Sequence, residues 1–223
     1  MIPRNIFLIL LFLSIMAVSS CSKETTTEEN VDYVAYVSKK EDSSHQKTFR
    51  ELNIGWLLDF SLELPYADQS WVNIWVEGYE DGEQLKASPL IQLSYGRAPS
   101  KTSTGSIGFG TIDSADHELF FLYGPGVYQI PQVLDVNESY FSTGAIQFDY
   151  AFLDETIQLQ SGETRVLAIF RHNDEAVLRT YDYYTQAGIN EMIEEETFVM
   201  LLKIKVEKGI DKEGAVYDWA SKK

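Results

Sequence analysis

The chain of 223 residues has little cysteine, little histidine and little positive charge. It holds one cysteine, Cys21, and three histidines that lie far apart, His45, His117 and His172. A single cysteine forms no intramolecular disulfide, and isolated histidines do not match a zinc pattern. Lys and Arg number 18 against 34 Asp and Glu, a formal net charge of −16. Because phosphate binding needs a basic face, we expect no nucleic-acid partner. We also expect neither a metal nor a cofactor, since no ligand pattern for either is present.

The one long apolar run lies at the amino terminus. From Ile6 to Val18 every residue except Ser14 is apolar, and Arg4 precedes the run as a positive flank. This layout is typical of an export signal. A membrane-spanning helix needs about 20 apolar residues, more than this run offers. The pattern therefore predicts a cleaved signal peptide over residues 1–20.

The four residues Val18, Ser19, Ser20 and Cys21 resemble the lipobox of bacterial lipoproteins. The resemblance implies a diacylglycerol on the sulfur of Cys21, which would become the mature amino terminus. It also implies a location on the extracytoplasmic face of the bacterial cell envelope, with the membrane as partner, because two acyl chains suffice for stable anchoring. An incidental cysteine in a secretory signal and an uncleaved anchor helix are the alternatives.

The rest of the chain divides by composition. Residues 21–30 form the predicted lipidated terminus and a polar tether, since SKETTTEEN carries four charges and no large apolar residue. Apolar and aromatic residues return from Val31 without a low-complexity break, which predicts one domain over 31–210. Residues 211–223 are predicted to be a charged tail.

Alternation of apolar and polar residues is the main structural signal in this domain. It is clearest at 52–64, where every even position is apolar, and at 198–206. Only 189–196 shows helical spacing. Many short strands and almost no helix predict an all-β fold, a single antiparallel β-sandwich in preference to a barrel. The other expected strands, bounded by turn residues, are 31–38, 70–79, 90–95, 105–113, 118–123, 127–134, 144–152, 156–160 and 164–171.

The strand within SWVNIWVEGYEDG, residues 70–82, is the best candidate for a ligand-binding surface. Its odd positions carry Trp71, Asn73, Trp75, Glu77 and Tyr79. Residues i and i+4 on a strand lie about 13 Å apart, so the two tryptophans would stack on two rings of a glycan. The alternative is that these aromatic residues form part of the core or cover an edge, because aromatic residues favour strands in any case.

No catalytic site is recognisable in the sequence. Ser114, Asp116 and His117 are residue types of a hydrolase triad, but their adjacency and their flanks indicate a solvated loop between strands. The glycines of GSIGFG, residues 105–110, lack the helix and the lysine of a phosphate loop and are interpreted as structural.

Acidic residues are too abundant for any catalytic pair to stand out. A glycosidase needs two carboxylates at a defined separation, which the sequence does not provide. The run 194–196, Glu-Glu-Glu, is interpreted as a solvated helical face.

Four segments of the domain, WVNIWVEGYEDGE, LSYG, IGFG and LLKIKVE, resemble uncharacterised lipoproteins of Gram-positive bacilli. The resemblance implies an envelope location and no activity. The favoured function is a lipid-anchored, non-catalytic binding or structural module whose partner is a glycan or an envelope protein. The alternative is an envelope carbohydrate-active hydrolase that uses a carboxylate pair.

Overall fold

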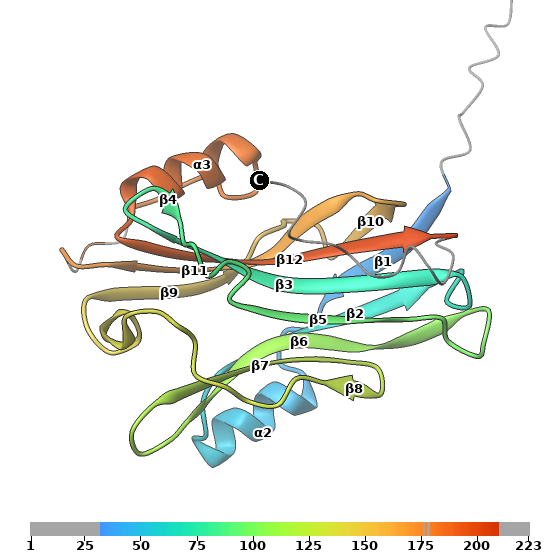
Figure 1. Ribbon diagram of the computed structural model, residues 1–223, viewed down its shortest axis with the longest axis horizontal. Coiled ribbons are helices and arrows are strands. Elements are labelled where there is room, and N and C mark those ends of the chain that lie inside the picture. The colour runs from blue at the N-terminus through green and yellow to red at the C-terminus, as the bar shows by residue number, and fades with distance from the viewer. Residues whose placement is uncertain (1–31, 176, 178, 210–223) are drawn as a thin grey trace, which may run out of the picture. The chain divides into compact units, whose positions relative to one another are not determined.

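A computed structural model describes residues 32–175, 177 and 179–209 of the protein. The predicted signal peptide, Cys21 with its tether and the charged tail lie outside these residues. The described chain consists mainly of strands in two antiparallel sheets that pack face to face (Figure 1). This architecture confirms the predicted all-β sandwich over the barrel alternative.

The two sheets, here called sheet A and sheet B, contain six hydrogen-bonded strands each. Sheet A has the order β10-β1-β2-β6-β7-β8, and sheet B has the order β4-β3-β12-β11-β9 with β5 beside β3. The strands of sheet A are β1 (Tyr33–Lys39), β2 (Leu57–Leu64), β6 (Ser103–Asp113), β7 (Glu118–Gly124), β8 (Val127–Tyr128) and β10 (Thr156–Gln160). Those of sheet B are β3 (Ser70–Glu80), β4 (Glu83–Gln84), β5 (Ile91–Gly96), β9 (Ala145–Tyr150), β11 (Thr164–Asn173) and β12 (Phe198–Lys208).

The hydrophobic core lies between the sheets. Even-numbered residues of β2, β3 and β12 point into it, because successive side chains of a strand alternate between faces. Phe60, Ile74 and Phe198 are fully buried there. Phe198 stacks on Tyr140, with ring centroids 4.5 Å apart, and Tyr140 belongs to the short helix η1 (Glu138–Phe141). The side chains of odd-numbered residues in these three strands lie on the outer faces of the sandwich.

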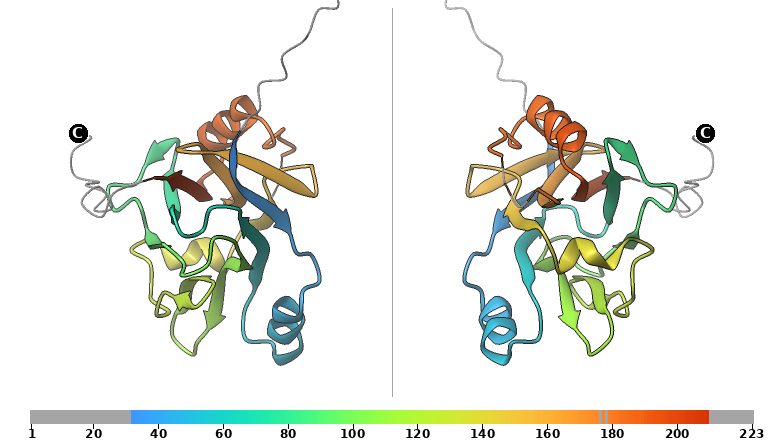
Figure 2. Two further views of the ribbon diagram at one scale, coloured as in Figure 1. Left: turned by 90° about the vertical axis from the view of Figure 1, so that its right-hand side faces the viewer. Right: turned by 90° about the vertical axis from the view of Figure 1, so that its left-hand side faces the viewer.

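Two helices lie on opposite sides of the sandwich (Figure 2). Helix α3 (Gln186–Glu195) covers part of the outer face of sheet B, where its Ile189 and Met192 pack with Leu201 of β12. It confirms the helix predicted over 189–196. Helix α2 (Ser44–Leu52) lies against sheet A.

Helix α2 corrects the predicted strand over 52–64, which starts only at Leu57. The helix begins with a capping box: Ser43 Oγ accepts from the Gln46 backbone, and the Gln46 side chain accepts from the Ser43 backbone. It ends at Asn53, whose φ of 49° is left-handed. The apolar residues at even positions before Leu57 are therefore spread over a helix end and a loop.

The strand expected over 127–134 is also shorter than predicted. Only Val127–Tyr128 forms a strand, and an isolated bridge joins Gln132 to Phe120. Pro131 has no amide hydrogen to donate, so the segment follows the edge of β7 without a regular ladder.

Candidate functional site

The residues predicted on β3 do share the outer face of sheet B. Glu77 is the centre of the group: its Oε1 accepts from Trp75 Nε1 at 2.8 Å, and its Oε2 accepts from Tyr79 OH at 2.7 Å. Lys203 of β12 donates to the same Oε2 at 2.6 Å. Three of the five predicted residues thus form one cluster with a lysine that sequence reasoning did not include.

Asn73 and Trp71 stand apart from this cluster. Asn73 is 1% exposed and accepts a hydrogen bond from Ser94 Oγ at 2.7 Å. Trp75 is 4% exposed, whereas Trp71 is half-buried. The Glu77 carboxylate is engaged by three donors, and the Asn73 amide is buried with its Nδ2 unpartnered among the described residues. Of the two tryptophans, Trp71 is the more accessible. Glycan stacking along β3 stays a prediction.

The Glu77 cluster makes stability depend on pH. Burial raises the pKa of the Glu77 carboxyl, but hydrogen bonds from Lys203, Trp75 and Tyr79 outweigh burial, so the pKa is lowered overall. A carboxyl whose pKa is lower in the folded state stabilises the fold above its unfolded pKa, near 4.3, and loses this contribution as the pH falls through the folded pKa.

We therefore expect Glu77→Gln to destabilise the protein by about 1–3 kcal/mol at pH 7, because Lys203 loses its charged partner. The difference from the parent should shrink as the pH falls below about 4. Denaturant unfolding of both proteins at a series of pH values measures this. A difference that stays constant down to pH 3 would contradict the assigned role.

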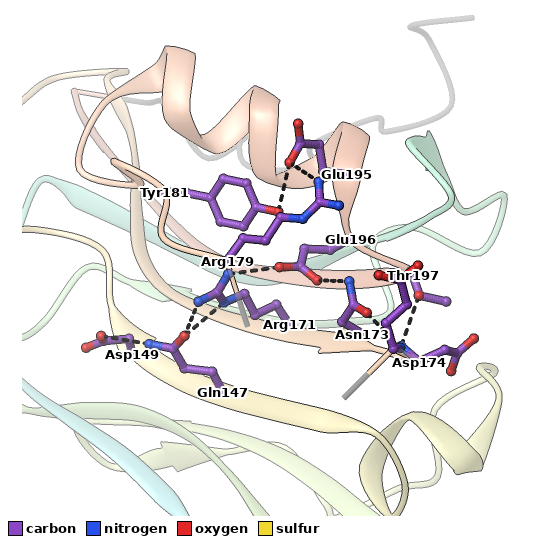
Figure 3. Close-up of polar contacts among 11 residues, drawn as sticks. Gln147, Asp149, Arg171, Asn173, Asp174, Arg179, Tyr181, Glu195, Glu196 and Thr197 are labelled. Atoms are coloured by element: carbon purple, nitrogen blue, oxygen red, sulfur yellow. Dashed lines mark hydrogen bonds and ion pairs between the residues drawn. The ribbon is translucent and has the colours of Figure 1, made fainter. Parts of the chain in front are cut away.

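A second polar cluster lies on sheet B beneath the chain leading into α3, and sequence reasoning missed it (Figure 3). Arg171 and Glu196 are 3% and 2% exposed, and Arg171 Nη1 lies 2.8 Å from Glu196 Oε1. Asn173 Nδ2 donates to the other carboxylate oxygen at 2.9 Å, and Gln147 Oε1 accepts from Arg171 Nε at 2.9 Å. Glu196 is therefore not part of a solvated face, which corrects the interpretation of 194–196.

This buried cluster is closed by the chain around it. The Arg171 guanidinium lies 5.1 Å from the ring centre of Tyr181. Nearer the surface, Arg179 pairs with Glu195 at 2.7 Å (Figure 3). Since a buried charge needs a partner, the arrangement holds the segment before α3 on the sheet. The role of the cluster is structural, because Arg171 and Glu196 form their hydrogen bonds with each other and with neighbouring residues.

The triad-like residues do not form a triad. Ser114 Oγ donates to the backbone carbonyl of His117 at 2.6 Å, so it points into its own turn. His117 Nδ1 lies 2.6 Å from Glu138 Oε1, and both side chains are about half exposed. The loop is solvated, as its sequence indicated.

A recess with a volume of about 500 Å³ lies between α2 and the loop that leads into β2. This volume is within the range of ligand sites in proteins. Aromatic rings and hydrogen-bonding side chains both line it, and they include Asp42, Gln46, Phe49, Arg50, Asn53 and Trp56. No member of this set was predicted from the sequence.

Contacts with distant strands shape the recess. Gln46 Nε2 donates to the Leu57 carbonyl and to Tyr150 OH, each at 3.0 Å, which joins α2 to β2 and β9. Trp56 Nε1 donates to Glu118 Oε1 at 3.1 Å, and its ring packs 3.8 Å from that of Phe148. The indole is therefore held rigidly at one side of the recess.

Glu118 supplies the carboxylate that accepts the hydrogen bond from the Trp56 indole. Burial raises its pKa, against the lowering effect of hydrogen bonds from Thr111 and Trp56. A carboxyl with a raised pKa is the kind that can act as a general acid. Glu118 is not itself among the residues that line the recess.

Beside the other flank of α2, strand β2 contributes a buried carboxylate, that of Asp59. Asp59 Oδ1 accepts from Tyr123 OH at 2.7 Å, and Asp59 Oδ2 lies 3.3 Å from His45 Nδ1. The His45 ring meets Tyr123 edge-on, with centroids 5.9 Å apart. These contacts fix the orientation of both rings on the outer face of sheet A.

Within residues 32–175, 177 and 179–209, no three or more His, Cys, Asp or Glu side chains gather as metal ligands would. In the same part of the chain no helix combines the length and the apolar composition that a membrane crossing needs. No protein-family model matches the sequence, and neither the search of curated proteins nor that of solved structures returned a significant match.

Proposed function

We propose that the chain is a lipid-anchored, extracytoplasmic binding module of the bacterial envelope, non-catalytic, with its ligand in the recess beside α2. The observation that supports binding is the recess itself, which combines a suitable volume with the aromatic residues Phe49 and Trp56 and the side-chain amide of Asn53. Ligand sites are typically concave and place orienting polar groups beside apolar surface. In this recess the polar side chains outnumber the aromatic ones.

The lipid anchor rests on the lipobox resemblance at Cys21. Residues 22–31 separate Cys21 from Asp32, and an extended chain of that length spans at most about 40 Å. Beyond it, β1 has 7 residues, about 23 Å, and α2 follows its far end. The ligand site is therefore a strand length away from the point where the tether joins the domain.

Anchoring is tested by Cys21→Ala. We expect the parent protein in the membrane fraction and the variant in the medium or periplasm, because no acyl chain holds it. Ser22→Ala, which leaves the lipidated residue in place, is the matched control. Membrane association that is unchanged in Cys21→Ala would defeat the lipoprotein assignment.

Ligand binding is tested with two variants on opposite faces of the sandwich. Soluble glycans and small polar compounds are screened by thermal shift, and the affinity of each hit is measured by calorimetry. We expect Phe49→Ala to weaken binding at least about tenfold, about 1.4 kcal/mol, and Trp71→Ala to leave it unchanged. Weaker binding by Trp71→Ala and unchanged binding by Phe49→Ala would instead place the ligand site on β3.

The hydrolase alternative has one observation in its favour, the raised pKa of Glu118 beside Trp56. A second carboxylate would have to come from Glu41 or Asp42 at the recess. The two proposals separate on one assay, since a hydrolase releases new reducing ends from a bound glycan and a binding module does not.

A further inference from the structure

A row of aromatic side chains leaves the recess and continues over the outer face of sheet A. Phe49 lines the recess, and its ring centre lies 5.8 Å from that of Phe121 on β7. Phe121 is followed by Tyr123, with centroids 6.2 Å apart and planes 29° apart. Tyr123 is paired across the sheet with Tyr128 of β8. We call Phe49, Phe121, Tyr123 and Tyr128 the aromatic row.

The aromatic row lies on the outer face of sheet A, where Phe49, Phe121 and Tyr123 are half-buried and Tyr128 is exposed. The residues that alternate with its members on β7, Phe120 and Leu122, are buried in the core, so Phe121 and Tyr123 point outward. Directly paired residues of antiparallel strands project on the same side, which places Tyr128 there as well. Tyr128 is 74% exposed, and so is Ile130 two residues later. Large apolar side chains that gather on a surface in this way mark interaction sites.

Contacts outside the hydrophobic core hold Tyr123, a central member of the aromatic row, in place. Tyr123 is fixed by its hydrogen bond to the buried Asp59. Gly108, opposite Asp59 in the sheet, leaves room for the ring: a Cβ there would lie 2.4 Å from Tyr123 Cε1. The tyrosine ring is thus kept against the sheet surface, and its rotation is restricted before any ligand arrives. Preorganisation of this kind lowers the entropic cost of binding.

We propose that the ligand is a neutral glycan chain with one end in the recess and successive sugar units over the aromatic row. The inference rests on the proposed function and names its ligand class. Rings about 6 Å apart offer repeated flat apolar surfaces to a polymer of flat repeating units. The side-chain amide of Asn53 offers hydrogen bonds at the recess. A net charge of −16 disfavours polyanionic chains.

The test uses the full-length chain in detergent and β-1,4-linked N-acetylglucosamine and glucose oligomers of one to six units, measured by calorimetry. Affinity should rise with length. Tyr128→Ala should weaken binding of the longest oligomer about fivefold or more and leave the shortest unchanged, whereas Phe49→Ala should weaken all. Tyr184→Ala, also exposed but on the segment before α3, is the matched control.

The outcomes separate this inference from the proposed function. Affinity that does not depend on length, or equal behaviour of Tyr128→Ala and Tyr184→Ala, overturns the chain-like ligand and leaves the recess as a binding site. Insensitivity of every oligomer to Phe49→Ala overturns the recess as well. Failure of the whole series to bind, or binding of an extended neutral peptide in its place, rejects the glycan.

Discussion

Glu196→Ala is expected to lower the free energy of unfolding by about 3–5 kcal/mol, because it leaves the Arg171 guanidinium charged and buried without its carboxylate. Asn173 loses its acceptor at the same time. The remaining contacts of Arg171 with Gln147 and Tyr181 are neutral and do not replace the lost charge. At roughly 2–4 °C per kcal/mol for a domain of this size, the melting temperature should fall by about 6–20 °C.

The control is the double variant Arg171→Met with Glu196→Leu. Well-packed apolar residues often replace a buried ion pair without loss, so the double variant should recover most of the stability. Thermal and denaturant unfolding of the parent, the single variant and the double variant measure the effect. If the double variant is as unstable as Glu196→Ala, the cost comes from packing and not from the unpaired charge.

Gly55→Ala is expected to destabilise the protein by about 2–5 kcal/mol and to abolish ligand binding in the recess. Gly55 has a φ of 138°, and a Cβ there would lie 2.2 Å from the Thr111 carbonyl oxygen. The strained backbone conformation costs about 1–3 kcal/mol, and relief of the overlap costs a similar amount. The loop must then move away from β6, and this loop carries Trp56.

Gly126 and Gly162 provide matched controls for this substitution. Both have positive φ angles, 74° and 81°, but a Cβ at either position would meet no atom within 4 Å. Alanine there should cost about 1–2 kcal/mol and leave the affinity of any recess ligand unchanged. Stability curves for the three alanine variants, with calorimetry on a screened ligand, separate overlap from backbone strain. Equal losses in all three would show that the Thr111 contact does not matter.

The fold was predictable in the strands where apolar and polar residues alternate in step with the buried and exposed faces. Residues 57–64 and 198–206 alternate because each strand has one face on the core, and both form strands. Helix α2 escaped prediction because only two of its nine residues, Phe49 and Leu52, are apolar, which is too few for a clear helical repeat. The local signal that would have revealed it is the capping box of Ser43 and Gln46, three residues apart.

The sites depend on contacts that sequence spacing does not contain. The face of β3 was predictable, because alternation alone places Trp75, Glu77 and Tyr79 together. The partner of Arg171 is 25 residues away in the chain, and the contact exists only after β11 and β12 pair. The recess likewise needs Tyr150 from β9 to position Gln46. Arg171, which directly follows the apolar run 166–170 of β11, was the one available signal for the buried cluster.

Strand β1 also has a mechanical meaning. In the proposed arrangement it follows the tether at one end; it leads to α2 at the other, and it lies between β10 and β2, antiparallel to both. If the chain is anchored and binds as proposed, a load between the membrane and a ligand in the recess runs along β1. The hydrogen bonds to both neighbours are then sheared together and share the load, instead of opening one after another as in a zipper. In the proposed arrangement, the strand that connects anchor and site is thus held by two antiparallel neighbours, whose hydrogen bonds resist its extraction together.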